Sequence, residues 1–169
     1  MKDLMSLYHE CIAELDSIGI EYGKIVSVKV NTRAQKRLGI CKGRRPTPYS
    51  DWSHTIEISQ RILEDYIDDS VTKNVIIHEI LHSCPNCRHH DSEWQKLAAK
   101  VNRELGYKVQ RVYSPEEYGL TPLPKPERKY VIVCTKCGQE VKRAKRTKVI
   151  TNPERYRCGR CGGTFERKS

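Results

Sequence analysis

Residues 78–82 have the sequence His-Glu-x-x-His, the pattern in this chain with the clearest chemical meaning. On a helix, His78 and His82 lie one turn apart on the same face, so both imidazoles can bind one metal ion. Glu79 can then act as a general base toward a water molecule that the metal polarises. The motif is surrounded by apolar residues, as in a helix that crosses a core: Val75, Ile76, Ile77, Ile80 and Leu81. The pattern predicts a zinc site with hydrolytic chemistry.

A catalytic zinc ion usually has three protein ligands and one open position. After His82, four residues are candidates for the third ligand: Cys84, Cys87, His89 and His90. The spacing HExxHxxGxxH would need a histidine at position 88, where Arg88 stands, so that arrangement is excluded. His90 precedes a predicted helix start, from which a ligand can fold back onto the metal.

Six of the eight cysteines form three CxxC pairs, a spacing typical of thiolate metal sites in reducing compartments. Two of the pairs are separated by twenty residues and match a four-cysteine zinc ribbon: Cys134, Cys137, Cys158 and Cys161. The module around them has almost no apolar core, so it needs a metal ion to fold. These cysteines are predicted to bind a structural zinc.

The remaining pair, Cys84 and Cys87, lies in the turn after the HExxH motif. These residues could bind a second metal with His89, form a disulfide, or remain reduced thiols that pack the turn. We favour the local structural role. If the thiols replaced His90 as ligands, the first zinc would be closed to substrate.

Several predicted elements must position these groups, and together they indicate an α+β fold. Helical periodicity covers residues 2–18, a short helix 60–67, the motif helix and a helix at 92–105. Asp68, Asp69 and Ser70 provide capping groups for the motif helix, which should stop near residue 84. Ser92 to Gln95 match a capping box at the start of the last helix, and Gly106 should end it. Alternating patterns predict strands at 24–30, 38–42 and 52–59. An antiparallel sheet of about three strands packed with helices is the simplest arrangement.

Charge and proline content divide the chain. Residues 1–120 form the predicted metal-site domain, 121–129 a Pro-rich linker, and 130–169 the zinc ribbon. Residues 125–169 contain 14 Lys and Arg against 4 acids, whereas residues 1–124 contain 17 of each. A compact basic module is typical of nucleic-acid binding, although solubility or an acidic protein partner would also account for it.

No apolar segment reaches membrane-spanning length, and the N-terminus is too polar for a secretion signal. We therefore expect a cytoplasmic monomer without membrane association. It would be nucleoid-associated if bound to DNA, or nuclear in a eukaryote.

The sequence resembles the SprT-like family of zinc metalloproteases, to which the eukaryotic Spartan proteases belong. In that family, HExxH is followed by a variable insert and then His-Gly-x-x-aromatic at a helix start. His90 and Trp94 fit this pattern, with Asp91 where the family usually has glycine. His89 would place Glu93 at the aromatic position, so the resemblance selects His90. It also covers the segments VNTRAQKRLGIC and TIEIS and extends over residues 5–165.

The resemblance implies a small zincin-like metalloprotease domain in which His78, His82 and His90 bind a catalytic zinc and Glu79 is the base. It also implies an endopeptidase for proteins bound or crosslinked to DNA, with the ribbon and its structural zinc bringing the protein to nucleic acid. For the oxyanion-stabilising group, the sequence offers His54, Arg111 and Tyr113 without a preference.

Two other functions are compatible with the same residues. In the first, the HExxH metal is structural and the chain is a non-catalytic, nucleic-acid-binding or transcription-associated zinc protein. In the second, the chain is a small hydrolase for another amide substrate. An exchangeable water on the first metal would distinguish an enzyme from a binding module.

Overall fold

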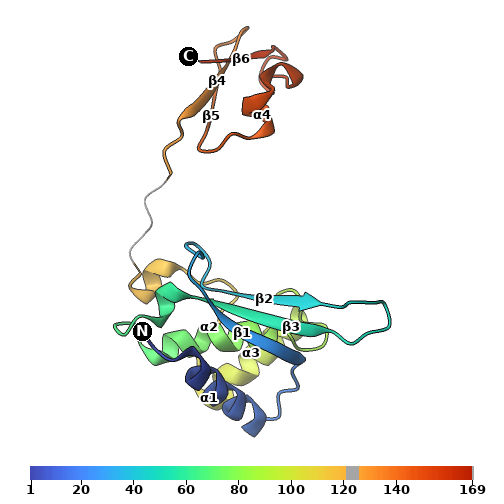
Figure 1. The fold of residues 1–169 in the computed structure, drawn as a ribbon, viewed down its shortest axis with the longest axis vertical. Coiled ribbons are helices and arrows are strands. Elements are labelled where there is room, and N and C mark those ends of the chain that lie inside the picture. The colour runs from blue at the N-terminus through green and yellow to red at the C-terminus, as the bar shows by residue number, and fades with distance from the viewer. Residues whose placement is uncertain (121–125, 169) are drawn as a thin grey trace. The chain divides into compact units, whose positions relative to one another are not determined.

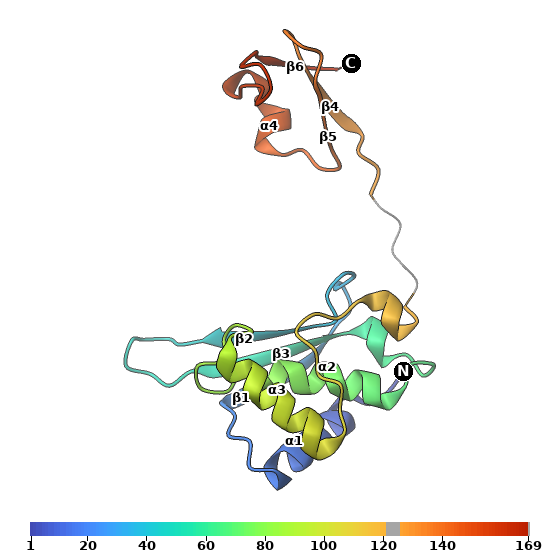
Figure 2. The same cartoon turned by 180° about the vertical axis from the view of Figure 1, so that it is seen from behind.

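The chain forms two compact units, residues 1–123 and 124–169, in a computed structural model that describes residues 1–120 and 126–168. Figures 1 and 2 show the two units. Much of the predicted linker, residues 121–125, lies outside the described residues. Within the part that is described, none of the helices has the length and apolar character needed to cross a membrane.

The first unit is a three-stranded sheet with three helices on one of its faces (Figures 1 and 2). Its elements are α1 (Leu4–Ser17), β1 (Lys24–Asn31), β2 (Gly39–Arg44), β3 (Ser53–Ser59), a 3₁₀ helix (Gln60–Leu63), α2 (Asp69–Leu81), α3 (Ser92–Leu105) and a second 3₁₀ helix (Pro115–Tyr118). This arrangement confirms the predicted α+β class and its three strands. The predicted helix at 60–67 is shorter than expected and has 3₁₀ geometry.

The sheet is mixed rather than antiparallel, which corrects the prediction. Its strand order is β1-β3-β2, with β2 antiparallel to β3 and β1 parallel to it. The third strand in sequence occupies the centre because it contains Ile56 and Ile58, which are fully buried. The connection between β1 and β2 must therefore pass the end of β3. With β3 in the centre, β1 and β2 are the two edge strands of the sheet.

Helix α2 is buried on nearly all sides because it lies between the sheet and the other two helices. Its apolar residues from Val75 to Leu81 have exposures of 0–1%, and the polar Asn74, His78 and Glu79 are each only 6% exposed. The Asp68 carboxylate accepts a hydrogen bond from the Ser70 amide, so the predicted N-terminal cap is present. Burying a histidine and a glutamate in a core helix is costly, which favours a functional reason for them.

The two outer helices follow the predicted periodicity. The apolar side of α1 buries Leu4, Leu7, Cys11 and Leu15, and that of α3 buries Trp94, Ala98 and Val101. The Asp3 carboxylate caps α1, and Gly106 ends α3 in the left-handed conformation at φ 72°. The start of α1 and the end of α3 are therefore defined by local residues.

The second unit is a small antiparallel sheet of order β5-β4-β6 with one short helix. Its elements are β4 (Tyr130–Cys134), β5 (Glu140–Arg143), α4 (Lys148–Thr151), a 3₁₀ helix (Pro153–Arg155) and β6 (Phe165–Arg167). The buried apolar residues are Ile132, Cys134, Ile150, Cys158 and Phe165. Two of these five are cysteines, so the apolar core alone is too small to hold the unit together.

Candidate metal centres

Three histidine side chains converge on one point above α2. The Nε2 atoms of His78 and His82 are 3.2 Å apart, and the Nε2 atom of His90 lies 3.0 Å from the first and 3.1 Å from the second. Three zinc–nitrogen bonds of about 2.0–2.1 Å at tetrahedral angles would place such atoms about 3.3–3.4 Å apart. The three nitrogens therefore fit a single tetrahedral metal ion closely.

Backbone carbonyl groups orient two of these rings. The Nδ1 atom of His78 lies 2.8 Å from the Gln110 carbonyl oxygen, and the Nδ1 atom of His82 lies 2.9 Å from the Cys87 carbonyl oxygen. A carbonyl can only accept a hydrogen bond, so each Nδ1 carries the proton and each Nε2 keeps a free lone pair. This is the tautomer that a metal ligand needs.

Aromatic rings enclose the histidine cluster. The Trp94 ring centroid lies 4.8 Å from that of His78 and 4.7 Å from that of His90, and the Tyr113 ring lies 5.2 Å from His78. Burial lowers the pKa of His78 to about 3, and it also lowers the pKa values of His82 and His90. The rings are therefore neutral at neutral pH, as metal binding requires.

The start of α3 fixes His90. The N-cap is Asp91, whose side chain accepts a hydrogen bond from the Trp94 amide at 3.3 Å, so the predicted cap at Ser92 is one residue late. Gln95 donates its side-chain amide to the His90 carbonyl at 2.9 Å. The aspartate that replaces the usual glycine of the resembled family thus begins the helix that positions the third histidine.

Glu79 lies between α2 and the edge strand β2. A Cβ atom at Gly39 would lie 2.6 Å from Oε1 of Glu79, so only glycine leaves room for the carboxyl group there. Burial raises the pKa of Glu79 to about 8, opposed by hydrogen bonding from the Cys41 backbone and by the charge of Arg37. The spacing of the motif does not reveal this contact, although a glycine inside a predicted strand is a signal of close approach.

The turn after the motif does not add ligands to the histidine cluster. Cys84 and Cys87 are free and buried, at 5% and 0% exposure. Over residues 1–120 and 126–168, only two sets of three or more side chains could hold a metal ion, the three histidines and the four distal cysteines. Neither includes the turn cysteines or His89. This arrangement agrees with a local structural role for the CxxC turn.

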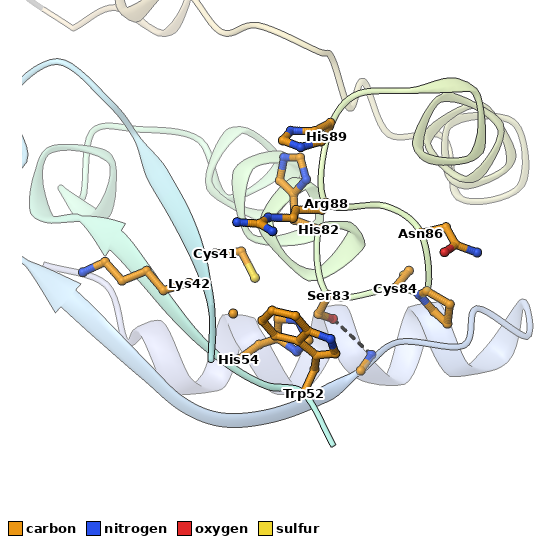
Figure 3. A pocket seen from close by; sticks show the side chains of 13 residues that line it. Cys41, Lys42, Trp52, His54, His82, Ser83, Cys84, Asn86, Arg88 and His89 are labelled. Carbon is orange, nitrogen blue, oxygen red and sulfur yellow. Dashed lines mark hydrogen bonds between the residues drawn. The ribbon is translucent and has the colours of Figure 1, made fainter. Parts of the chain in front are cut away.

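A cavity of about 730 Å³ adjoins the histidine cluster. It lies between the ends of β2 and β3 and the turn after α2, with Trp52 and His54 facing Arg88 and His89 across it (Figure 3). His82 also lines it, and none of the lining residues is acidic. The cavity therefore gives access to the site for a ligand with an uncharged or anionic group.

The three candidates for oxyanion stabilisation have different surroundings. The Tyr113 hydroxyl donates a hydrogen bond to the Asn74 carbonyl at 2.9 Å, so its proton is already used in a structural hydrogen bond. His54 faces the cavity, and its Nδ1 atom is buried without a hydrogen-bond partner among the described residues. Arg111 lies close enough to His90 for its charge to lower the pKa of that ring. Of the three, Tyr113 is therefore the least available to stabilise an oxyanion.

The four distal cysteines form the second candidate centre, in the second unit. Their sulfur atoms lie within 4.8 Å of one another, with Cys134 and Cys161 at 3.5 Å and Cys137 and Cys158 at 3.7 Å. Tetrahedral Zn–S bonds of about 2.3 Å give separations near 3.8 Å, whereas a disulfide requires about 2.05 Å. The set fits a metal ion and not two disulfides.

Two equivalent turns present these sulfur atoms. The Gly138 amide bonds to the Cys134 carbonyl at 2.9 Å, and the Gly162 amide bonds to the Cys158 carbonyl at 2.8 Å. Both glycines are left-handed, at φ 69° and 71°. The predicted zinc-ribbon-like arrangement is therefore present in the second unit.

An α+β unit with three converging histidines on an HExxH helix, followed by a four-cysteine module, defines a metal-binding protein of the HExxH class. The family model described as "SprT-like family" matches residues 7–114. The chain belongs to the SprT-like family, as the sequence resemblance indicated.

Curated relatives with the name "Protein SprT-like" cover most of the chain. The protein from Staphylococcus epidermidis (strain ATCC 35984) is 32% identical over 157 residues, 89% of each chain. The one from Staphylococcus aureus (strain JH9) is 31% identical over 138 residues, 79% of this chain and 78% of the relative. The one from Bacillus subtilis (strain 168) is 30% identical over 118 residues, 68% of this chain and 70% of the relative. No solved structure matches.

Proposed function

We propose that this protein is a zinc-dependent endopeptidase that cleaves proteins attached to nucleic acid. The observation that carries the proposal is the number of ligands at the first centre. Three histidines converge there, and among the described residues no fourth His, Cys, Asp or Glu joins them. Three ligands are typical of a catalytic zinc, and four are typical of a structural one.

The residues of the site have separate roles in this proposal. His78, His82 and His90 hold the metal, which when bound polarises a peptide carbonyl and makes a water molecule more acidic. The charge of a bound metal ion would counter the raised pKa of Glu79, and the ionised carboxylate would then take a proton from the attacking water and pass it to the leaving amine nitrogen. The free edge of β2 lies beside Glu79 and can pair with an extended substrate backbone.

The second unit supplies the affinity for nucleic acid. Its 14 Lys and Arg against 4 acids give it a high positive charge, and it has few aromatic residues for stacking on bases. Phosphate contacts, which do not depend on sequence, therefore dominate its binding. Attachment through this unit raises the local concentration of any protein bound to the same nucleic acid.

We expect the protein to cleave a substrate that is covalently attached to an oligonucleotide at least about tenfold faster than the same substrate alone. The measurement is product formation on denaturing gels, with both metals confirmed by elemental analysis. Reversing two exposed ribbon charges, in Lys145→Glu with Arg146→Glu, should reduce this advantage and leave cleavage of the free substrate unchanged. No cleavage of either substrate by the fully metal-loaded protein would support the non-catalytic nucleic-acid-binding function instead.

A second expected result concerns the contact between β2 and the catalytic glutamate. The Gly39→Ala variant should lose about tenfold to a hundredfold in cleavage rate, because its Cβ atom must displace the carboxyl group of Glu79. Metal content should not change, since the three atoms nearest to a new Cβ at Gly39 all belong to Glu79. The matched control is Gly43→Ala on the same strand, where the nearest atom to a new Cβ is 3.3 Å away, in Trp52. Equal activity of the two variants would show that the position of Glu79 is not critical.

A further inference from the structure

The charges of the first unit cancel in sum but are separated along the chain. Residues 22–50 contain eight Lys and Arg and no Asp or Glu, whereas residues 1–21 and 51–124 contain nine Lys and Arg and 17 Asp and Glu. All eight basic side chains are exposed: Lys24, Lys29, Arg33, Lys36, Arg37, Lys42, Arg44 and Arg45. The net charge of zero thus conceals a strongly basic stretch, residues 22–50, which we call the basic segment.

The basic segment forms both outer strands of the sheet and the connections next to them. The helices cover one face of the sheet in both views, so the opposite face is open among the described residues (Figures 1 and 2). The acid on that open face, Glu57, pairs with Lys42 and accepts a hydrogen bond from Asn31 at 2.7 Å. Within residues 1–120 and 126–168, Lys42 is the only one of the eight cations in an ion pair. The other seven charges are available to a partner.

Exposed aromatic rings lie at one end of the basic segment, in the connection between β2 and β3. This connection projects beyond the helices in both views (Figures 1 and 2). Tyr49 is 98% exposed and Trp52 is 44% exposed. The guanidinium carbon of Arg45 lies 5.4 Å from the centroid of the Trp52 ring. Exposed rings together with arginines form a surface on which unpaired bases can stack.

The same residues adjoin the candidate active site. Gly39 contacts Glu79, and Lys42 and Trp52 line the cavity that reaches His82 (Figure 3). A polyanion bound along β2 and the projecting connection would therefore lie beside the metal centre of its own unit.

We infer that the basic segment is a second nucleic-acid-binding surface, separate from the ribbon, which takes single-stranded nucleic acid. The charge pattern alone would suit any polyanion. The exposed Tyr49 and Trp52 favour a single strand, because its bases are free to stack while its phosphates contact the lysines and arginines. An acidic protein segment would use the charges but would leave the aromatic rings without a matching partner. Binding at this surface does not depend on catalysis, so it can be tested whether or not the protein cleaves peptides.

The test measures the affinity of the full chain for a fluorescent oligothymidylate as a function of salt concentration. Arg44→Glu combined with Arg45→Glu should weaken binding about tenfold at low salt and reduce the slope of log affinity against log salt by about 1.4, the value for two lost phosphate contacts on a single strand. Trp52→Ala should weaken binding at least about fivefold with little change in slope, because stacking does not release counterions. Oligothymidylate should also quench the fluorescence of Trp52, whereas Trp94, at 1% exposure, should not respond.

The matched control applies the same charge change elsewhere in the first unit. Lys96→Glu with Arg103→Glu reverses two exposed cations on α3, with side-chain exposures of 69% and 70%. This variant should keep the salt slope of the original chain. All altered residues are on the surface, and thermal melting checks that each variant is folded. A salt slope and Trp52 fluorescence that are the same in the basic-segment and control variants would overturn the inference. Competition by polyglutamate as strong as that by oligothymidylate would also overturn it, in favour of an acidic protein partner.

Discussion

We expect the Glu79→Gln variant to keep its metal and to lose peptide-bond cleavage by at least about a hundredfold. The amide has almost the same size as the carboxyl group, so it fits the space between α2 and Gly39. It cannot take a proton from water, however, and no other carboxyl group lies on this part of the helix. Cleavage of a DNA-attached protein measures the loss, and elemental analysis measures the metal.

The control for this variant is Glu93→Gln, the same change on α3 at a side chain that is 52% exposed. It should retain full activity, because Glu93 lies on the solvent side of its helix. If Glu79→Gln cleaved as fast as the control, the assignment of Glu79 as the base would be wrong. A metal content that fell together with activity would instead assign Glu79 a role in holding the site together.

Local signals made most of the helices predictable. Asp68 caps α2 and Gly106 ends α3 at the expected places, because capping depends on residues within one turn of the helix end. The HExxH spacing likewise brought two histidines to one face of α2. His90 was different, since spacing left four candidates for the third ligand. It required the family pattern, and the structure then placed its Nε2 atom beside the other two.

Contacts between distant segments were not predictable from these patterns. The alternation of apolar residues identified three strands but not their order, so the parallel pairing of β1 with β3 was missed. The carbonyl groups of Gln110 and Cys87 orient His78 and His82, but they are backbone groups, so the types of side chain in the sequence do not indicate them. The position of Glu79 against Gly39 also depends on the packing of a strand on a helix. In each case the determining partner is a backbone group or a neighbour brought in by the tertiary fold.

The net charge of zero over residues 1–124 conceals a basic surface in this unit. Residues 1–124 contain equal numbers of cations and acids in sum, so total charge indicates only the ribbon as a basic surface. The basic segment is apparent only when charges are counted by structural element. The nucleic-acid contact that we infer would then be shared by both units, with the ribbon providing affinity and the basic segment placing a single strand near the metal centre.

The ribbon should depend on its metal for folding, and Cys134→Ser tests this dependence. Removing one of four thiolates should reduce the metal content from two ions per chain to one and unfold most of the second unit. A structural zinc contributes roughly 10–16 kcal/mol in comparable small modules, and the three buried apolar residues of this unit other than its cysteines, Ile132, Ile150 and Phe165, cannot replace that amount. Amide resonances of residues 130–168 should collapse to unfolded positions in heteronuclear NMR spectra, while those of the first unit should not move.

The reciprocal variant makes this prediction specific. His78→Ala should remove the other metal ion and leave the ribbon resonances unchanged, because the two centres lie in separate compact units. Cys134→Ser should weaken DNA binding much more than His78→Ala does, since the folded ribbon arranges its cations on a fixed surface. A Cys134→Ser protein that kept dispersed ribbon resonances after losing its metal would show that strand pairing around Ile132 and Phe165 is sufficient. The dependence of this unit on metal would then be disproved, whereas the assignment of the histidine centre would stand.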